Sequence, residues 1–320
     1  MNILITGGTG FLGHYLVNKL WLRKHKIYAL VRDPQKCPTG CTAITGDVTK
    51  GNLGIDKVPK NLDEIWHGAA TINLSKKARQ ESFALNSGSV FNVIDFARKQ
   101  KLKRIIHIST AYADTKRNPY EESKWWAEQY LNEASKHPFN PIPVLILKPS
   151  ILVAEYETGT MPKGIRPGAF YEFVRRLIRI HRRIERMKKR VEKTLHLPPW
   201  QFCFRVPGDP DATLNLLPVD IAAKKMVEIA AENDAGVFYI TNPSPPILRD
   251  LVEWISDVIS LTLRIESPSF LFPHERAFIS VASDFLPYLR GEPTWQSAID
   301  FPVLVDRYYV QKTIQWLMRQ

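Results

Sequence analysis

The sequence has no long apolar run and very little cysteine. No stretch of about 18 apolar residues occurs among its 320 residues, which excludes a transmembrane helix. The first residues have the pattern of a strand, with no basic segment ahead of an apolar one, so we expect no secretory signal. Three cysteines, Cys37, Cys41 and Cys203, are too few and too scattered for a disulfide framework. These absences favour a cytoplasmic protein with reduced thiols.

Patterns that bind metals or nucleic acids are also missing. Cys37 and Cys41 lack the further Cys or His partners that a zinc site needs, and the eight histidines show no metal spacing. The formal net charge is +12, but no nucleic-acid-binding motif accompanies it. We therefore expect neither a metal nor a nucleic acid as a ligand. A composition of 44% hydrophobic and 24% charged residues is typical of a globular protein.

Apolar runs alternate with helical patterns through the first 150 residues. Strands are expected at 2–6, 27–32, 42–46, 64–67, 104–109 and 142–148. Helices are expected at 12–24, 79–100 and 120–135. Strands that alternate with helices form right-handed βαβ units and a parallel sheet. The sequence therefore predicts an α/β fold with a Rossmann-type doubly wound parallel sheet.

The second half of the chain has a looser pattern. Helices are expected at 168–195, 219–232, 247–260, 274–289 and 305–318, with one strand near 237–241. We predict a dinucleotide-binding domain over residues 1–150 and a smaller, mainly helical substrate-binding lobe over residues 151–320. Part of this second half, residues 200–242, is expected to return to the sheet.

A glycine-rich turn joins the first expected strand to the first expected helix. Gly7 permits the tight turn, Gly10 lets a pyrophosphate approach the backbone, and Gly13 allows close packing of helix and sheet. The free N–H groups at a helix start also favour phosphate. The alternative is a glycine-rich turn that binds nothing. We predict a dinucleotide site formed by Gly7, Thr9, Gly10, Phe11, Leu12 and Gly13.

The residues after the second strand bear on the choice of cofactor. An acidic residue there would favour NAD, because it can bond the ribose 2′-hydroxyl. The strand instead ends in Val31, followed by Arg32 and Asp33. A guanidinium matches a 2′-phosphate in charge and geometry, so Arg32 favours NADP(H). The alternative is a surface arginine that Asp33 neutralises.

A hydroxyl-bearing strand end is followed by a tyrosine and a lysine on one helix. Tyr120 and Lys124 are four residues apart and therefore share a helix face. A nearby ammonium group would lower the pKa of the tyrosine, and Thr110 could hold the same substrate oxygen. Thr110, Tyr120 and Lys124 are thus the predicted catalytic residues. The alternative is an ordinary surface helix.

Taken together, these motifs resemble those of an extended short-chain dehydrogenase/reductase. Within that superfamily the chain is most similar to fatty acyl-CoA reductases and to the thioester reductase domains of peptide and polyketide synthetases. Beyond the Tyr120/Lys124 pair, the matching runs are Thr-Gly-x-x-Gly-x-x-Gly (6–13), Gly-Asp-Val-Thr (46–49), His-Gly-Ala-Ala (67–70), Asn-x-Gly-Ser (86–89), Ser-Thr-Ala-Tyr (109–112), Lys-Pro-Ser-Ile (148–151) and Leu-Leu-Pro-Val-Asp (216–220). Relatives usually carry a longer substrate-facing loop between the positions of Thr110 and Tyr120.

The resemblance implies further cofactor contacts. Asp47 and Val48 should contact adenine, and Ala69 and Ala70 should line the cofactor near its ribose. Lys124 should also bond the nicotinamide ribose. The remaining implied cofactor-binding residues are Asn86, Pro149, Ser150 and Ile151.

The resemblance also implies an activity. It favours an NADPH-dependent reductase that converts an acyl thioester, carried by CoA or by an acyl carrier protein, to an aldehyde or alcohol. A ketone or aldehyde reductase, or a sugar-nucleotide epimerase, could use the same residues. A third possibility is a regulatory protein that binds NADP without turnover. The helices at 79–100 and 120–135 form the dimer face in many relatives, which makes a homodimer a further expectation.

The positive charge is concentrated in one expected helix. Residues 163–193 hold twelve Lys or Arg and three Glu, a local balance of +9. Apolar residues recur every three or four positions along it, from Phe170 to Val191. Three interpretations of helix 168–195 stay open: a solvated helix packed on the lobe or a twin subunit, a dock for an acyl carrier protein or CoA phosphates, and attachment to an anionic membrane surface.

Overall fold

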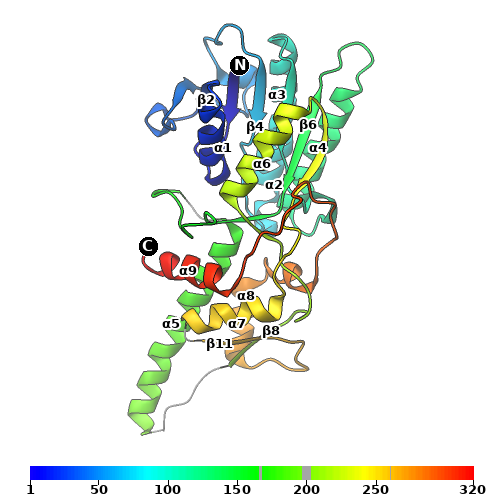
Figure 1. The fold of residues 1–320 in the computed structure, drawn as a ribbon. Helices are drawn as coiled ribbons and strands as arrows, with labels where there is room; N and C mark the ends of the chain where they lie inside the picture. Colours follow the sequence, from blue (N-terminus) through cyan, green and yellow to red (C-terminus); the bar gives the residue numbers. More distant parts are fainter. Residues whose placement is uncertain (166–167, 197–202, 260) are drawn as a thin grey trace.

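A parallel seven-stranded sheet organises the first half of the computed structural model, which describes residues 1–165, 168–196, 203–259 and 261–320 (Figure 1). Its strands are β1 (Asn2–Thr6), β2 (Lys26–Val31), β3 (Cys41–Thr45), β4 (Glu64–His67), β5 (Arg104–Ile108), β6 (Val144–Pro149) and β10 (Gly236–Ile240). The order is β10-β6-β5-β4-β1-β2-β3. This arrangement confirms the predicted doubly wound sheet. The order reverses between β1 and β4, and ligands bind such sheets at that point.

Helices cover both faces of the sheet. On one face lie α1 (Phe11–Leu22) and α6 (Val219–Glu232), and on the other lie α3 (Ser89–Lys99) and α4 (Pro119–Ser135). The strand β1 shows why, because Ile3 and Ile5 pack in the core on the α1 side while Leu4 packs on the α3 side. A strand that is apolar on both faces must be covered on both faces.

The second half forms a cap below the sheet in the view of Figure 1. Its helices are α5 (Ala169–Leu195), α7 (Leu248–Ile259), α8 (Pro273–Ala282) and α9 (Arg307–Met318). Two small parallel sheets join them, β8 (Cys203–Val206) with β11 (Thr262–Ile265) and β7 (Ile151–Val153) with β9 (Leu216–Pro218). These helices and strands share one apolar core. The second half also supplies β10 and α6 to the first, whereas the predicted division at residue 150 stays a prediction.

Some elements differ from the sequence-based expectation. The helix expected at 79–100 divides into α2 (Arg79–Ser82), a π-helical segment (Phe83–Gly88) and α3. The helix expected at 274–289 ends at Ala282, and a 3-10 helix follows over Leu286–Arg290, because Pro287 cannot continue an α-helix. The strands β7, β8, β9 and β11 were not predicted, since three or four residues carry too little periodicity.

Parts of two expectations lie outside the described residues. They are residue 260, the last of an expected helix, and residues 200–202, the start of the segment expected to return to the sheet. Within the described parts of the chain, no helix is long and apolar enough to span a bilayer. Cys37, Cys41 and Cys203 are free thiols.

Candidate active site

The predicted site residues meet at one edge of the sheet. Most of them follow the carboxyl ends of the strands, from Gly7 after β1 and Arg32 after β2 to Thr110 after β5. Parallel strands place these ends at the same edge, and the crevice opens where the strand order reverses. The structure thus brings together residues that are more than 100 positions apart in the sequence.

The glycine-rich loop forms a tight turn into α1. Gly7 has a φ of +76°, which a side chain would strain, and a Cβ there would lie 2.6 Å from Gly68. A Cβ on Gly13 would lie 2.0 Å from the Gly7 carbonyl oxygen. Gly10 is exposed at the start of α1, and its N–H donates to the Gly7 oxygen at 3.0 Å. The loop therefore needs glycine at Gly7 and Gly13 for its own geometry, while a Cβ on Gly10 would approach only the Gly7 oxygen, at 3.2 Å.

Arg32 and Asp47 lie near each other at the ends of β2 and β3. Arg32 is exposed, and its charge helps to lower the pKa of Asp47. The main cause of that lowering is hydrogen bonding, because Asp47 Oδ1 accepts from Thr49 N at 2.9 Å and from Thr49 Oγ1 at 2.8 Å. Val48 is buried, and its carbonyl accepts from Asn92 Nδ2 at 2.9 Å. An ionised Asp47 and a free guanidinium thus border the end of the crevice where adenosine is expected.

Asn86 holds the segment that follows β4. Its Oδ1 accepts from Thr71 N at 2.8 Å, and its Nδ2 donates to Thr71 O at 3.0 Å and to Ser123 Oγ at 2.9 Å. Asn86 is buried in the π-helical segment, so its amide is already fully engaged. It can position Ala69 and Ala70, which are half-buried at the crevice, and it joins them to α4.

The three predicted catalytic residues come together between β5 and α4. Thr110 is buried and forms a hydrogen bond with Tyr120. Lys124 is buried one turn further along α4, and its Nζ donates to the Ile108 carbonyl at 2.6 Å. Tyr120 is half-buried against the cap core. A hydroxyl, a phenol and an amine therefore converge at the end of β5.

The pKa values differ from the sequence-based expectation. Burial raises the pKa of Tyr120, Glu121 raises it further, and the hydrogen bond with Thr110 opposes the shift. The expected lowering by Lys124 is not among the causes of the Tyr120 shift, and burial lowers the pKa of Lys124 itself to about 8. Tyr120 is therefore a protonated phenol at neutral pH. It can donate a proton to an oxygen that becomes negative.

A cluster of charges, with Lys148 and Glu128 buried and Asp114 exposed, supports the triad. Lys148 Nζ lies 2.9 Å from Glu128 Oε2 and 2.8 Å from Asp114 Oδ2. The Ser109 hydroxyl donates to Glu128, and the pKa of Glu128 is raised mainly by burial, against the pull of Lys148. This cluster joins the ends of β5 and β6 to α4. Sequence analysis did not identify Glu128 or Asp114, although Glu128 lies one turn beyond Lys124 on the same helix.

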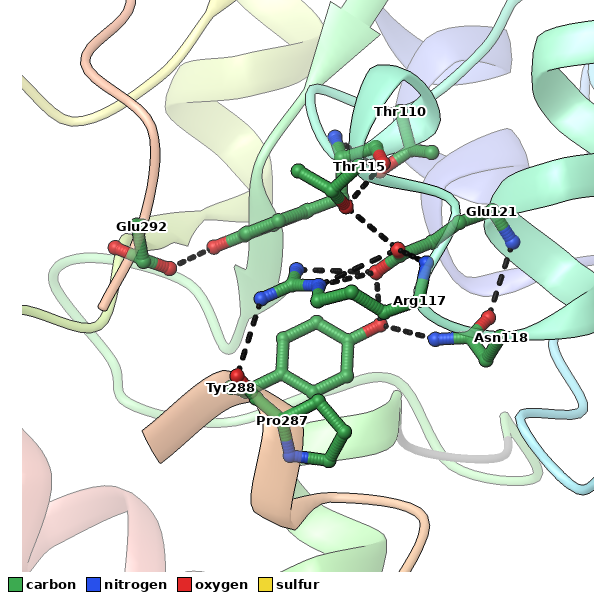
Figure 2. Close-up of polar contacts among 9 residues, drawn as sticks. Thr110, Thr115, Arg117, Asn118, Glu121, Pro287, Tyr288 and Glu292 are labelled. Atoms are coloured by element: carbon green, nitrogen blue, oxygen red, sulfur yellow. Dashed lines mark hydrogen bonds and ion pairs between the residues drawn. The ribbon is translucent and has the colours of Figure 1, made fainter. Parts of the chain in front are cut away.

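A second cluster holds the start of α4 (Figure 2). Arg117 Nη2 lies 3.0 Å from Glu121 Oε1, and Glu121 is fully buried. The guanidinium carbon of Arg117 lies 4.0 Å from the ring centroid of Tyr288. The Tyr288 hydroxyl donates to Glu121 Oε1 at 2.6 Å and accepts from Asn118 Nδ2 at 2.9 Å. Because Tyr288 belongs to the cap, this cluster ties the cap to the helix of Tyr120.

The short loop from β5 to α4 is fixed by the same side chains. Glu121 Oε2 accepts from Thr115 Oγ1 at 2.6 Å and from Arg117 N at 2.7 Å. Tyr112 donates its hydroxyl to Glu292, and burial raises the pKa of Glu292 to about 7 (Figure 2). Sequence analysis missed this cluster because no local spacing relates residues 112–121 to residues 288–292.

The far side of the crevice has an unused hydroxyl. Pro149 ends β6, Ser150 N donates to Ile240 O at 3.1 Å, and Ile151 N donates to Asn215 O at 3.1 Å. Within the described residues, the Ser150 hydroxyl is buried and has no hydrogen-bond partner. This hydroxyl, the exposed backbone at Gly10 and the exposed guanidinium of Arg32 suit a dinucleotide along this edge. Among the described residues, no three His, Cys, Asp or Glu side chains gather as a metal site requires.

The chain is similar in sequence to known reductases and dehydrogenases. A family profile described as "NAD dependent epimerase/dehydratase family" matches residues 3–176, more than half of the chain. Fatty acyl-CoA reductase 1 of Xenopus laevis is 30% identical over 155 residues, covering 38% of this chain and 30% of that protein. Two further curated relatives are 3-beta-hydroxysteroid dehydrogenases. The matched part spans only 30% to 41% of the length of these three relatives.

Solved structures share the fold along the whole chain. The terminal R domain from the myxalamid PKS-NRPS biosynthetic pathway has a TM-score of 0.71 at 19% identity, covering 99% of this chain and 90% of that domain. A UDP-galactose 4-epimerase has a TM-score of 0.64 at 17% identity, covering 100% of this chain and 99% of that protein. Both likenesses therefore extend through the sheet and the cap.

Proposed function

Because this chain belongs to the NAD dependent epimerase/dehydratase family of extended short-chain dehydrogenases/reductases, we propose that it is an NADPH-dependent reductase of an acyl thioester. The observation that carries the proposal is the meeting of Thr110, Tyr120 and Lys124 at the end of β5, on the same edge of the sheet as the glycine-rich loop after β1. A tyrosine that stays protonated suits reduction, since the substrate oxygen must then receive a proton from the enzyme.

The protein residues handle the oxygen and the proton. When bound, the nicotinamide cofactor would supply a hydride to the carbonyl carbon. As the carbonyl bond opens, its electron pair moves to the oxygen, which Thr110 holds and Tyr120 protonates. Lys124, with a pKa of about 8, is suited to returning a proton to Tyr120. Lys124 and Ser150 would hold the cofactor, and Asn86 would keep Ala69 and Ala70 against it.

A thioester substrate adds one further step. The first reduction gives a hemithioacetal, in which the former carbonyl carbon carries a hydroxyl and the sulfur. Loss of the thiol breaks the carbon–sulfur bond and leaves an aldehyde, and a second reduction would give an alcohol. The similarity to a fatty acyl-CoA reductase and to the fold of a terminal R domain supports this substrate class.

A second candidate is a ketone or aldehyde reductase, or a sugar-nucleotide epimerase, that uses the same residues. The whole-length fold match to a UDP-galactose 4-epimerase favours it. Against the epimerase stands Arg32, because an epimerase of this type normally prefers NAD, and a guanidinium after β2 favours the 2′-phosphate of NADP. A regulatory protein that binds NADP without turnover would share the loop but would need no Thr110, Tyr120 and Lys124 constellation.

The choice of cofactor can be tested at Arg32. Arg32→Glu removes a cation and adds a charge that repels the 2′-phosphate, so NADPH should bind roughly 10 to 100 times more weakly, as expected for a lost charge-assisted hydrogen bond. NADH should bind at least as well as before. Titration calorimetry with both cofactors measures the change. Equal loss for NADH and NADPH would contradict a 2′-phosphate role, and Lys36→Glu, also exposed near β2, serves as the control.

The reaction is tested by product analysis. The purified protein is given NADPH with matched thioester and ketone substrates, and products are identified by mass. Aldehyde or alcohol from the thioester supports the proposal, while turnover of the ketone alone supports the second candidate. Tyr120→Phe should lower kcat by at least about 100-fold, as for loss of a general acid, with NADPH affinity unchanged. Full activity in that variant would refute the role of Tyr120.

The protein partner that we propose is a second copy of the chain. On the outer side of α3 and α4, Phe91 is 51% and Trp126 is 38% exposed, and Tyr130 packs against both rings. Aromatic side chains gathered on a surface are typical of interfaces. Light scattering after gel filtration should give a dimer, and Phe91→Glu with Trp126→Glu should give a monomer.

A further inference from the structure

The helix α5 has two unlike halves. Its first half packs into the cap core, with Tyr171, Val174 and Leu177 buried. Its second half, residues 181–195, extends beyond the rest of the molecule at the lower end of Figure 1. We call residues 181–195 the projecting half of α5. Among its described side chains, none is fully buried.

The apolar row of α5 continues past the end of the core. Ile180 and Ile184 still pack against the cap core, whereas Met187 is 59% and Val191 is 42% exposed. Spacings of four, three and four residues place all of them on one face of the helix. The row that anchors the first half therefore leaves two apolar side chains in solvent on the projecting half.

The charges of the projecting half are divided between its flanks. On one flank Lys188 Nζ lies 3.4 Å from Glu185 Oε1 and 3.9 Å from Glu192 Oε1, so that flank holds one cation and two anions, a net charge of −1. The rest of the helix surface carries six exposed cations, of which Arg183 and Arg190 border the apolar row while Arg182 and Lys189 lie opposite it. They form no ion pair with an acidic side chain in the described parts of the chain. They are Arg182, Arg183, Arg186, Lys189, Arg190 and Lys193. A helix that needed only solubility would not require this separation.

An apolar row bordered by cations suits the surface of an anionic bilayer. Such a helix lies in the plane of the interface, with its apolar side chains at headgroup depth and its cations on lipid phosphates. Arg and Lys have long apolar stems that let the charge reach the phosphates while the helix sits lower. The six cations extend over residues 182–193, roughly 17 Å of helix at 1.5 Å per residue, which suits an extended charged surface.

A second segment of the cap favours a membrane, rather than an acidic protein, as the binding partner. The loop of residues 266–272, between β11 and α8, also lies at the end of the molecule away from the seven-stranded sheet (Figure 1). It exposes Phe270 by 59% and Phe272 by 46%, with the Arg205 guanidinium 5.3 and 5.0 Å from their ring centroids. A lipid surface can accommodate exposed apolar side chains that lie apart from one another beside cations, because it deforms around each of them. The projecting half itself has no Phe, Tyr or Trp, the residues enriched in the centres of protein interfaces.

We propose that the projecting half of α5 binds the surface of an anionic phospholipid bilayer, through Met187 and Val191 inserted among the headgroups and the six cations placed on phosphates. This inference goes beyond the proposed reaction and does not depend on it. It assigns the end of the cap away from the seven-stranded sheet to a lipid surface.

Vesicle binding by the whole protein tests the proposal. The protein is mixed with vesicles of phosphatidylcholine alone or of phosphatidylcholine with phosphatidylglycerol, and bound protein is separated by flotation. Binding should require phosphatidylglycerol and should fall roughly tenfold or more between low and high salt, as screening predicts. Failure to bind the anionic vesicles at low salt would overturn the proposal, which is also the result expected if the cations dock an acidic protein.

Variants can distinguish the effect of the charges on α5 from the effect of the net charge of the whole protein. Arg182→Glu, Arg183→Glu and Arg186→Glu together should abolish binding, while Met187→Ser and Val191→Ser together should weaken it roughly tenfold through lost apolar burial. The matched control, Lys57→Glu with Lys60→Glu and Lys99→Glu, makes the same change in net charge at exposed sites of the sheet domain. The proposal is wrong if this control weakens binding as much as the triple variant of α5. All variants should melt at the wild-type temperature because their side chains are exposed.

Discussion

At the residue scale, the glycine-rich turn between β1 and α1 was predictable. The spacing of its glycines follows from the local geometry of the turn, so it can be recognised in the sequence. The spacing of Tyr120 and Lys124 follows in the same way from the geometry of one helix. The Lys148 partners Glu128, which is buried, and Asp114, which is exposed, were not predictable, because these contacts depend on strands and helices that meet only in the fold. The raised pKa of Tyr120 was missed for the same reason, since burial is a property of the packed site.

Alanine should have different effects at two glycines of the loop, Gly13 and Gly10. Gly13→Ala should destabilise the protein by about 2–4 kcal/mol, because the new Cβ would overlap the Gly7 oxygen and force the helix away from the sheet. Gly10→Ala should change stability by less than about 1 kcal/mol, since its Cβ would approach only the Gly7 oxygen, at 3.2 Å. It should nevertheless lose most NADPH affinity. Urea unfolding measures the stability of each variant, and calorimetry measures its NADPH affinity. Equal destabilisation by Gly13→Ala and Gly10→Ala would contradict the geometry of the turn.

Lys124 should lower stability at neutral pH. The folded protein binds its proton with a pKa of about 8, against 10.5 for an ordinary lysine, so between these values the unfolded state holds more protons. The contribution of Lys124 to stability therefore rises with pH across that window. Lys124→Met should be about 1–2 kcal/mol more stable than wild type at pH 7, after the lost bond to Ile108, and inactive. The stability gap should narrow toward pH 10, and a gap that stays constant would refute this account.

At the scale of helices and strands, apolar periodicity predicts some elements and misses others. The strand and helix pattern of residues 1–150 was largely predicted, because its short apolar strands alternate regularly with helical patterns. The short strands β7, β8, β9 and β11 were not predicted. The helix α5 was predicted, but not the residue at which it stops packing against the cap. That point depends on where the cap core stops, which the helix sequence alone does not encode.

The start of α4 should depend on one cap tyrosine. Tyr288→Phe removes the hydroxyl that joins Glu121 to Asn118 but keeps the ring beneath Arg117. We expect a loss of about 1–3 kcal/mol in unfolding free energy, typical of a buried acceptor left short of a donor. Activity should fall mainly in kcat, because Tyr120 lies on the turn of helix that loosens. Tyr308→Phe, at a tyrosine that is 72% exposed, is the control and should change neither quantity. An unchanged kcat would show that the cluster only supports the fold.

At the scale of the whole molecule, the two halves depend on each other. The edge strand β10 and the covering helix α6 come from the second half of the chain, yet both complete the sheet of the first. The sequence predicted that residues near 237–241 form a strand, but strand order cannot be read from periodicity. The cap in return reaches back to α4 through Tyr288.

A fragment of residues 1–150 should therefore not fold cooperatively. It would leave β6 without its neighbour β10, and it would expose the apolar surface that Val219, Met226 and Val227 cover. A variant that joins residue 153 to residue 216 through a short linker and ends at residue 242 keeps both elements and should fold. Circular dichroism and urea unfolding compare the two chains. Cooperative unfolding of the 1–150 fragment would contradict this dependence.

The position of β10 also affects how the protein is made. A ribosome releases β6 about 90 residues before β10, and at roughly 5–20 residues per second this delay lasts about 5–18 s. Throughout that time the nascent chain presents an open parallel edge and an uncovered apolar face. Synthesis thus passes through a long-lived unfinished state that favours chaperone binding, and codons that slow translation between residues 150 and 236 would prolong it.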